Sequence, residues 1–332
     1  MLSIEEASNP SYTQDSCLWD CGWYRSIVEN GYNSYPHSNE DGDGANWAFF
    51  PLFPILANIA SRVFFVSGEK ALTSGSVFFL YCSILTFMIY VEKTLGRVHA
   101  IDAGVLLAFN PYLVYAYSGY AESLTFFLCT LCFLALLGRR YLCAGFLGAF
   151  LSASRLVGIF FVFPLARNLL SFGRSRSPYS LLLALLLSPL GLALYMYHLF
   201  DLTGDPLAFK NVQISWGRTL VNPLAQTFSG LSQGGWHAWF SFVFLFAVLV
   251  GIYLLAKGCT DLALYLLPSV LLPAFYGLSS MPRFVFWQMP FLYGLLLLTR
   301  SSRLTRSLLL VMAGSFSSIT TFYWFLGRSV LN

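Results

Sequence analysis

The sequence predicts an all-α polytopic membrane protein with about ten transmembrane helices. Of its 332 residues, 57% are hydrophobic and only 10% are charged, whereas a soluble domain carries about 25% charged residues. The mean hydropathy of +0.66 indicates the same solvent, a lipid bilayer. The apolar runs are continuous rather than alternating, which argues against a membrane β-barrel. This composition also excludes a disordered chain and a nucleic-acid-binding protein.

Ten apolar segments follow residue 70, and each is expected to be a membrane helix or part of one. The apolar pattern breaks at Ser154 and Arg155, so that 141–153 and 155–170 are either one long interrupted helix or two short ones. The ten segments are 71–91, 99–117, 119–138, 141–153, 155–170, 179–199, 237–256, 262–278, 284–299 and 307–327.

The residues before these segments differ in composition. The first 46 residues are polar and acidic, and the apolar stretch 47–66 is interrupted by prolines, so it is expected to lie at the membrane surface. We therefore divide the chain into an extracytoplasmic segment, 1–66, with amphipathic juxtamembrane helices, and a transmembrane domain, 67–332. The long polar connection 200–236 is the main outer loop of that domain.

Charge separates the two sides of the predicted bundle. The connections after residues 91, 138, 170, 256 and 299 hold eleven basic and three acidic residues, a net of +8. The remaining eight basic and twelve acidic residues give −4 on the other side. Basic connections stay in the cytoplasm, so 1–66, 118–122, 154–155, 200–236 and 279–283 are placed outside. A chain that begins outside needs either unaided translocation of its short tail or one more helix upstream.

The seven cysteines give little indication of a metal site. Cys129 and Cys132 form a CxxC within an apolar run, with no second pair and no nearby histidine, and are expected to be core residues. Cys17 and Cys21 lie four positions apart in a polar segment. They form either a disulfide or two packed thiols, and we favour the thiols. No cofactor is predicted, and a divalent metal is not indicated.

The segment LWDCGWYRSIVENGY (18–32) has the pattern of an amphipathic helix. Trp19, Trp23 and Ile27 form one apolar stripe, with Tyr24 beside it, which suits a helix lying in the membrane interface. Asp20 lies at the border of the polar and apolar faces. It is either a helix cap or a partly desolvated carboxylate able to act as a general base.

Two further ionisable residues lie at predicted helix ends. Glu122, in FNPYLVYAYSGYAESL (109–124), opens a helix and is either an N-terminal cap or a paired membrane carboxylate. Arg155, in SASRLVG (152–158), interrupts an apolar run, and its expected partner is a carboxylate or a phosphate. The stretch NWAFFPLFP (46–54) begins a short surface helix that could line a groove for lipids.

The later outer segments add more charged and aromatic residues. The segment TGDPLAFKNVQISWGR (203–218) contains Asp205 and Arg218 and has the length of a lid. In SSMPRF (279–284), Arg283 lies at the mouth of a helix. Together with the aromatic residues, these carboxylates and guanidinium groups suit a sugar attached to a lipid phosphate, because guanidinium grips phosphate through two hydrogen bonds.

In this order, the six segments resemble the PIG-V family, whose eukaryotic member is the GPI mannosyltransferase that adds the second mannose to the glycosylphosphatidylinositol core. That family belongs to the GT-C class of membrane glycosyltransferases. The resemblance covers about residues 18–290. It rests mainly on WDxxWYxxIxxxGY followed by FFPLFP, with support from YAESL, SRxxG and GDPLAF.

The resemblance implies an inverting hexosyltransferase, of the mannosyltransferase type, that uses a polyprenyl- or dolichyl-phosphate sugar. It implies a lipid-linked or glycolipid acceptor, with a protein also open, and a GT-C-like bundle in a bacterial inner membrane or the ER membrane. The active site would face the extracytoplasmic or lumenal side. Asp20 would be the base; Trp19, Trp23, Tyr24, Glu122, Arg155, Asp205, Arg218 and Arg283 would bind substrates.

Two other functions are compatible with the residues. A polar-lipid transporter or flippase usually shows internal repeats and midplane charges, whereas this chain shows no repeat and its ionisable groups gather on one side. A non-catalytic membrane subunit of a glycosylation complex would use the outer carboxylates only as helix caps.

Overall fold

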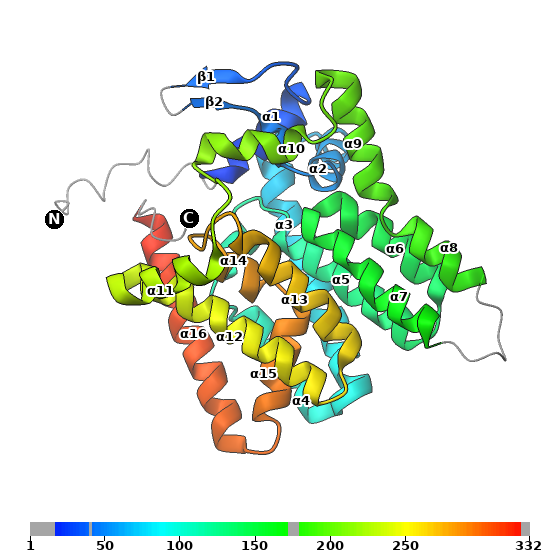
Figure 1. Ribbon diagram of the computed structural model, residues 1–332, viewed down its shortest axis with the longest axis vertical. Helices are drawn as coiled ribbons and strands as arrows, with labels where there is room; N and C mark the ends of the chain where they lie inside the picture. The colour runs from blue at the N-terminus through cyan, green and yellow to red at the C-terminus, as the bar shows by residue number, and fades with distance from the viewer. Residues whose placement is uncertain (1–16, 40–41, 172–178, 327–332) are drawn as a thin grey trace.

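The computed structural model describes residues 17–39, 42–171 and 179–326. Apart from one short hairpin, these ranges consist of helices and their connections, and Figure 1 shows the helices gathered in one elongated bundle. Four helices of the described chain are long and apolar enough to cross a membrane: Gly68–Leu95, Tyr179–Thr203, Gly235–Ala256 and Arg303–Phe325. The predicted all-α polytopic membrane fold is confirmed.

Each of the ten predicted apolar segments is largely helical in the structure. In chain order the elements are α1 (Asp20–Asn30), β1 (His37–Asn39), β2 (Gly42–Gly44), η3 (Asn46–Ala48), α2 (Leu52–Phe64), α3 (Gly68–Leu95), α4 (Arg97–Ala108), η4 (Leu113–Ala116), α5 (Glu122–Leu137), α6 (Tyr141–Ser154), η5 (Leu156–Phe161), α7 (Val162–Leu170), α8 (Tyr179–Leu187), α9 (Leu190–Thr203), α10 (Ala208–Asn211), η6 (Val212–Trp216), α11 (Pro223–Gln233), α12 (Gly235–Ala256), α13 (Thr260–Ala274), α14 (Met281–Phe286), α15 (Met289–Thr299) and α16 (Arg303–Phe325).

Two segments differ from their predicted form. The predicted helix 99–117 ends at Ala108, because Asn110 turns the chain: its side chain accepts from the Tyr112 N–H (2.8 Å) and donates to the Phe286 carbonyl (2.7 Å). The polar connection 200–236 is not a simple loop, since it contains α10, η6 and α11. The break at Arg155 separates two short helical segments, α6 and η5–α7, rather than interrupting one long helix.

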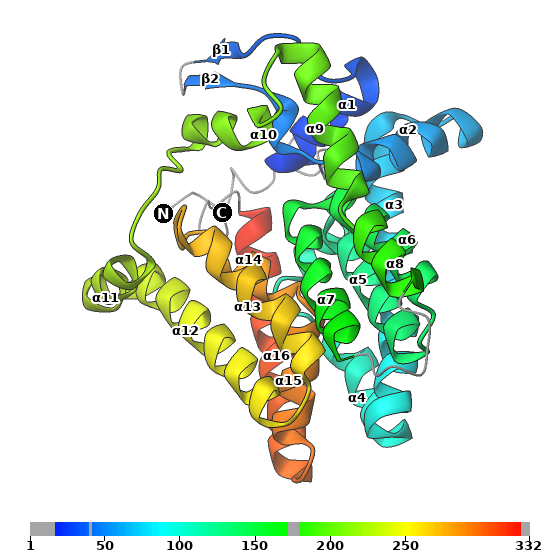
Figure 2. The ribbon, with the colours of Figure 1, turned by 45° about the vertical axis from the view of Figure 1, so that its right-hand side comes forward.

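Polar elements and basic turns lie at different ends of the bundle. Both ribbon views place α1, the β1–β2 hairpin and α10 at one end and the α15–α16 turn at the opposite end (Figures 1 and 2). Ion pairs join the connections that charge assigned to the basic side: Arg167 to Asp261 (3.0 Å) and Arg306 to Asp102 (3.3 Å).

Helix α1, predicted as an amphipathic helix at the membrane surface, packs against its neighbours in the bundle. Its apolar side, including Tyr24, Ile27 and Val28, is buried against α2 and α3. The Asn58 side chain of α2 donates to the Val28 carbonyl (2.6 Å), which fastens the two helices together. Helix α2 carries the exposed apolar face, formed by Ile55, Ile59, Val63 and Phe64. An amphipathic pattern identifies the apolar stripe of α1 but not what covers it.

Two asparagines, Asn33 and Asn46, join the two ends of the segment that follows α1 by hydrogen bonds. Asn46 is fully buried, and its amide donates to the Gly31 carbonyl (3.0 Å) while its Oδ1 accepts from the Asn33 N–H (3.0 Å). The Trp47 indole donates to the Asn33 carbonyl (2.6 Å), and Tyr195 of α9 donates to the Trp47 carbonyl (2.6 Å). These bonds tie the segment after α1 to the bundle.

The beginning of α5 is aligned against α3 by two serine hydroxyls. Ser76 Oγ donates to the Tyr120 carbonyl (3.0 Å), and Ser83 Oγ donates to the Ser123 carbonyl (2.8 Å). Both serines are fully buried. The start of α5 therefore lies beside the middle of α3, more than two helical turns beyond Gly68.

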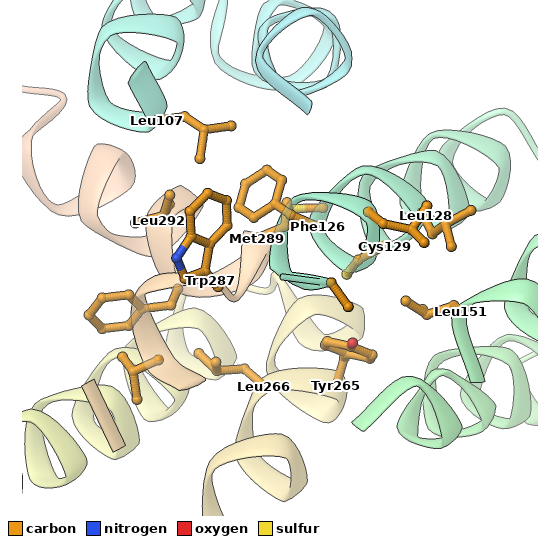
Figure 3. Packing of buried hydrophobic residues seen from close by; sticks show 14 of the residues in the cluster. Leu107, Phe126, Leu128, Cys129, Leu151, Tyr265, Leu266, Trp287, Met289 and Leu292 are labelled. Atoms are coloured by element: carbon orange, nitrogen blue, oxygen red, sulfur yellow. The ribbon is translucent and has the colours of Figure 1, made fainter. Parts of the chain in front are cut away.

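The apolar core lies between these polar contacts and the basic turns. Figure 3 shows Phe126, Tyr265, Trp287 and Met289 in a packed cluster to which α4, α5, α6, α13 and α15 contribute side chains. On its flank, α6 meets α8 and α9 through small residues, as membrane helices often do. A Cβ on Gly145 would overlap the backbone of Ala184.

We predict that Gly145→Ala lowers the free energy of unfolding by about 1–3 kcal/mol, because the added methyl group forces α6 and α8 apart. Gly75→Ala in α3 is the matched control, since its Cβ would lie 3.7 Å from the Phe53 ring, an ordinary contact. Thermal unfolding of the purified protein measures both. Equal melting temperatures for the two variants would contradict the close approach of α6 and α8.

Candidate active site

A cavity of about 440 Å³ is lined in part by α1. Its walls come from α1, residues 48–50 before α2, the Arg155 turn, the α10–η6 segment, the end of α13 and α14. Charged and aromatic side chains share this lining: Asp20, Arg155, Lys210, Arg218 and Arg283, with Tyr24, Phe49, Phe50, Phe209, Trp216, Tyr276 and Phe284. Segments far apart in the chain thus form one mixed charged and aromatic chamber.

The carboxylate of Asp20 reaches this cavity from the first residue of α1. The helix makes no side-chain cap, so the capping interpretation of Asp20 does not hold; Oδ2 instead accepts from Arg283 Nη1 (2.5 Å). The Asp20 N–H donates to the Tyr120 hydroxyl (3.1 Å), which itself donates to the Leu18 carbonyl (3.0 Å). The side chain of Asp20 is 29% exposed, so a substrate in the cavity can touch it.

Cys17 and Cys21 form a disulfide that encloses the residues leading into α1. The sequence is compatible with either a disulfide or two packed thiols, and the thiols were the favoured prediction. The structure differs because the chain turns back at Trp19, which has a φ of 58°, and brings the two Cα atoms to 5.0 Å. That separation is within the range that a disulfide spans.

Glu122 holds two guanidinium groups at the base of the cavity. Its side chain is fully buried at the first position of α5, and Oε1 accepts from Arg155 Nη1 (2.5 Å) and from Arg283 Nε. Glu122 makes no side-chain cap of α5. With Asp20, the four groups carry two negative and two positive charges, so the cluster is neutral. Mutual pairing is what makes buried charges tolerable.

Two adjacent aromatic rings pack against the guanidinium of Arg283. Its guanidinium carbon lies 4.7 Å from the ring centroids of Tyr115 and Tyr120, a cation–π arrangement. Neither tyrosine was predicted as a site residue. The sequence signal for them was the tyrosine-rich run YLVYAYSGY just before Glu122, but such a run does not show which cation its rings will contact.

Arg155 lies at the tip of a tight reversal between α6 and η5. Its backbone is extended, with φ −160° and ψ 153°, and η5 folds back so closely that a Cβ on Gly158 would overlap the Leu151 carbonyl. The Arg155 guanidinium also lies over the Phe284 ring, 5.2 Å from its centroid. The reversal therefore presents Arg155 to both Glu122 and the cavity.

Arg218 differs from the other two cavity arginines. It donates to Ser280 Oγ (3.2 Å) and lies over the Phe284 ring (5.9 Å), but it has no carboxylate partner in the described ranges. Burial lowers the pKa of its guanidinium, with smaller effects from the neighbouring charges. It nevertheless stays protonated, as arginine does in proteins. An anion in the cavity would find its uncompensated positive charge here.

The remaining predicted site residues line the cavity, support it from behind or lie apart from it. Tyr24 lines the cavity, and burial raises the pKa of its hydroxyl, so it is a neutral donor. Trp23 packs on Phe49 and edge-on to Trp216. Trp19 is 44% exposed and is not part of the lining. Asp205 is not part of it either; it shapes the segment before α10, accepting from the Leu207 N–H (2.8 Å) and the Asn211 amide (2.7 Å).

Comparison with known proteins gives limited guidance. No family model matches the chain, and no curated protein matches it. Among solved structures, the oligosaccharyltransferase of Archaeoglobus fulgidus, in a complex with Zn and sulfate, aligns with a TM-score of 0.44 and 15% identity. The alignment covers 93% of this chain and 48% of that protein, so this chain spans about half its length. At that TM-score, the likeness carries no argument about activity.

We predict that Arg283→Met lowers the free energy of unfolding by about 3–5 kcal/mol, because it leaves the buried Glu122 carboxylate with one partner and Asp20 with none. Arg167→Met is the matched control. The side chains of its ion pair with Asp261 are 42% and 28% exposed, so the loss there is about 0–1 kcal/mol. Thermal unfolding of both variants tests the contrast, and equal losses would contradict the central role of Arg283.

Proposed function

We propose that this protein is an integral-membrane glycosyltransferase of the GT-C class. It would move a hexose, mannose by the resemblance to the PIG-V family, from a polyprenyl- or dolichyl-phosphate donor to a lipid-linked or glycolipid acceptor. The observation that carries the proposal is that one cavity contains both an accessible carboxylate, Asp20, and a guanidinium, Arg218, that has no carboxylate partner among the described residues. A base and an anion site are what a sugar attached to a lipid phosphate requires.

Asp20 would be the general base. Arg283 binds Oδ2, and no hydrogen bond engages Oδ1 in the described chain, so this oxygen can accept the proton of an acceptor hydroxyl. As that proton moves to Asp20, the acceptor oxygen attacks the anomeric carbon. The bond from this carbon to the phosphate oxygen breaks, and the phosphate keeps the electron pair. One displacement inverts the anomeric configuration.

Arg218 would receive most of the charge on the departing phosphate. Arg155 and Arg283 are both engaged by Glu122, so their charges are already compensated. Arg218 and Lys210 both line the cavity. An arginine can donate two hydrogen bonds to a phosphate in a planar arrangement, and here the Phe284 ring and Ser280 hold its guanidinium in place.

The size and lining of the cavity suit a hexose. A volume of about 440 Å³ lies within the usual range for small-molecule sites, roughly 300–1,000 Å³. Trp216, Tyr276 and Phe209 offer apolar ring surfaces to a sugar, while Gln213 and Ser280 offer hydrogen bonds. We propose no cofactor, since the Arg283 guanidinium lies between the two carboxylates that a cation would otherwise bind.

We place the cavity on the extracytoplasmic or lumenal face of a bacterial inner membrane or the ER membrane. The net charges of +8 and −4 support this orientation through the positive-inside bias. The Cys17–Cys21 disulfide supports it independently, because disulfides persist mainly in oxidising compartments.

We predict that Asp20→Asn lowers kcat by about 10²- to 10⁴-fold, the usual contribution of a general base, and leaves the melting temperature within a few degrees. The assay follows transfer from radiolabelled polyprenyl-phosphate mannose to a total lipid extract. Asp261→Asn, in the ion pair with Arg167 at the basic turns, is the control and should keep full kcat. Unchanged kcat in Asp20→Asn would favour a non-catalytic subunit, and transport into liposomes without transfer would favour a transporter.

We predict that Arg218→Met lowers kcat/KM for the donor by about 10- to 100-fold, because a charge-assisted hydrogen bond to phosphate is lost. Arg62→Met, on the exposed surface of α2, changes the same charge away from the cavity and should have no effect. Donor titration in the transfer assay measures both. Equal values for the two variants would remove Arg218 from the phosphate site.

A further inference from the structure

The Cys17–Cys21 disulfide surrounds the proposed base. It encloses Leu18, Trp19 and Asp20 and joins the irregular residues before α1 to the first turn of that helix. Cys21 is fully buried and Cys17 nearly so. The bond therefore decides how the chain enters α1, and with it the direction in which Asp20 leaves the backbone.

The backbone inside this loop has an unfavourable conformation. Trp19 has φ 58° and ψ −120°, which a residue other than glycine rarely adopts. Its side chain is 44% exposed and makes no cap on α1, so its own packing does not explain the conformation. Two contacts hold this conformation. The disulfide joins the residues on either side of Trp19 in the chain, and the Tyr120 hydroxyl accepts from the Asp20 N–H and donates to the Leu18 carbonyl.

The disulfide is also packed against the turn that carries Tyr120. Gly119 has φ +77°, and a Cβ there would overlap Sγ of Cys21. The neighbouring Tyr120 contacts both Asp20, through its hydroxyl, and Arg283, through its ring. A continuous set of contacts thus runs from the disulfide through Gly119 and Tyr120 to the Asp20–Arg283 ion pair.

We propose that the Cys17–Cys21 disulfide is a positioning device for Asp20, so that sugar transfer depends on the oxidation of this pair. The inference rests on the proposed role of Asp20 as the base. A dithiol reductant would break the S–S bond by exchange, giving two protein thiols and one oxidised dithiol. Trp19 is then free to return to negative φ, which carries the Asp20 carboxylate out of line with the cavity.

The rest of the molecule should survive this reduction. The disulfide closes only a five-residue loop, and short loops restrict the unfolded chain least. Glu122 keeps Arg155 and Arg283, and the side chains of α1 that pack on α2 and α3 lie beyond Cys21. Reduction is therefore expected to change the geometry of one carboxylate rather than the fold.

The test compares the full-length protein in lipid nanodiscs before and after dithiothreitol, and after reoxidation. Mass spectrometry of alkylated peptides reports the state of Cys17 and Cys21. We expect reduction to lower kcat by about 10- to 100-fold, the effect of misplacing a catalytic group, while KM for polyprenyl-phosphate mannose changes less than about twofold. A merely structural bond would shift KM and the melting temperature as well.

Two variants complete the design. The double variant Cys17→Ser/Cys21→Ser should show the low kcat of the reduced protein with or without dithiothreitol. Cys82→Ser, which removes a thiol that forms no disulfide in α3, should keep the sensitivity of the wild type to reductant. Full kcat in the double variant, or in protein whose Cys17 and Cys21 are shown to be reduced, would overturn the inference.

Hydrogen exchange separates this inference from the proposed function. Reduction should accelerate exchange of the amides at 18–22, including the Asp20 N–H that bonds to Tyr120, and leave α5 unchanged. If the oxidised wild type transfers no sugar, the proposed function fails, and accelerated exchange would still support the positioning device. Unchanged exchange after verified reduction would overturn the device even if transfer were observed.

Discussion

The site depends on one guanidinium group. Arg283 binds Asp20 through one nitrogen and Glu122 through another, and it packs against the adjacent rings of Tyr115 and Tyr120. Through these contacts it joins the first helix of the described chain to α5 and α14. Without it, two carboxylates would face each other in a poorly solvated space, and like charges in such a place repel strongly. The same bridge leaves Arg218 as the cavity guanidinium with an uncompensated charge among the described residues.

Much of the fold could be predicted because the bilayer imposes a simple rule on the sequence. A helix pairs its backbone N–H and C=O groups within itself, so long apolar runs fold as helices in a bilayer. The ten predicted apolar segments are largely helical in the structure. What covers α1 could not be predicted in the same way. An apolar stripe suits both the membrane interface and a neighbouring helix, and in the structure Tyr24 and Ile27 are buried against α2 and α3.

The candidate site was predictable as a set of residues but not as an arrangement. Asp20, Glu122, Arg155 and Arg283 stand out in the sequence because charges are rare in it, and rarity alone marks them. Their pairing could not be predicted, since Arg283 lies 263 positions from Asp20 and 161 from Glu122. Tyr120 was missed for the opposite reason, because it is one tyrosine among nineteen.

The two serine hydroxyls that align α5 with α3 also fix the height of Tyr120 along α3. Ser76, bonded to the Tyr120 carbonyl, lies eight residues beyond Gly68, or about 12 Å along the axis of α3. Tyr120 in turn supports Asp20 through its hydroxyl and Arg283 through its ring. A slide of α5 along α3 would therefore shift the supports of both members of the Asp20–Arg283 ion pair at once.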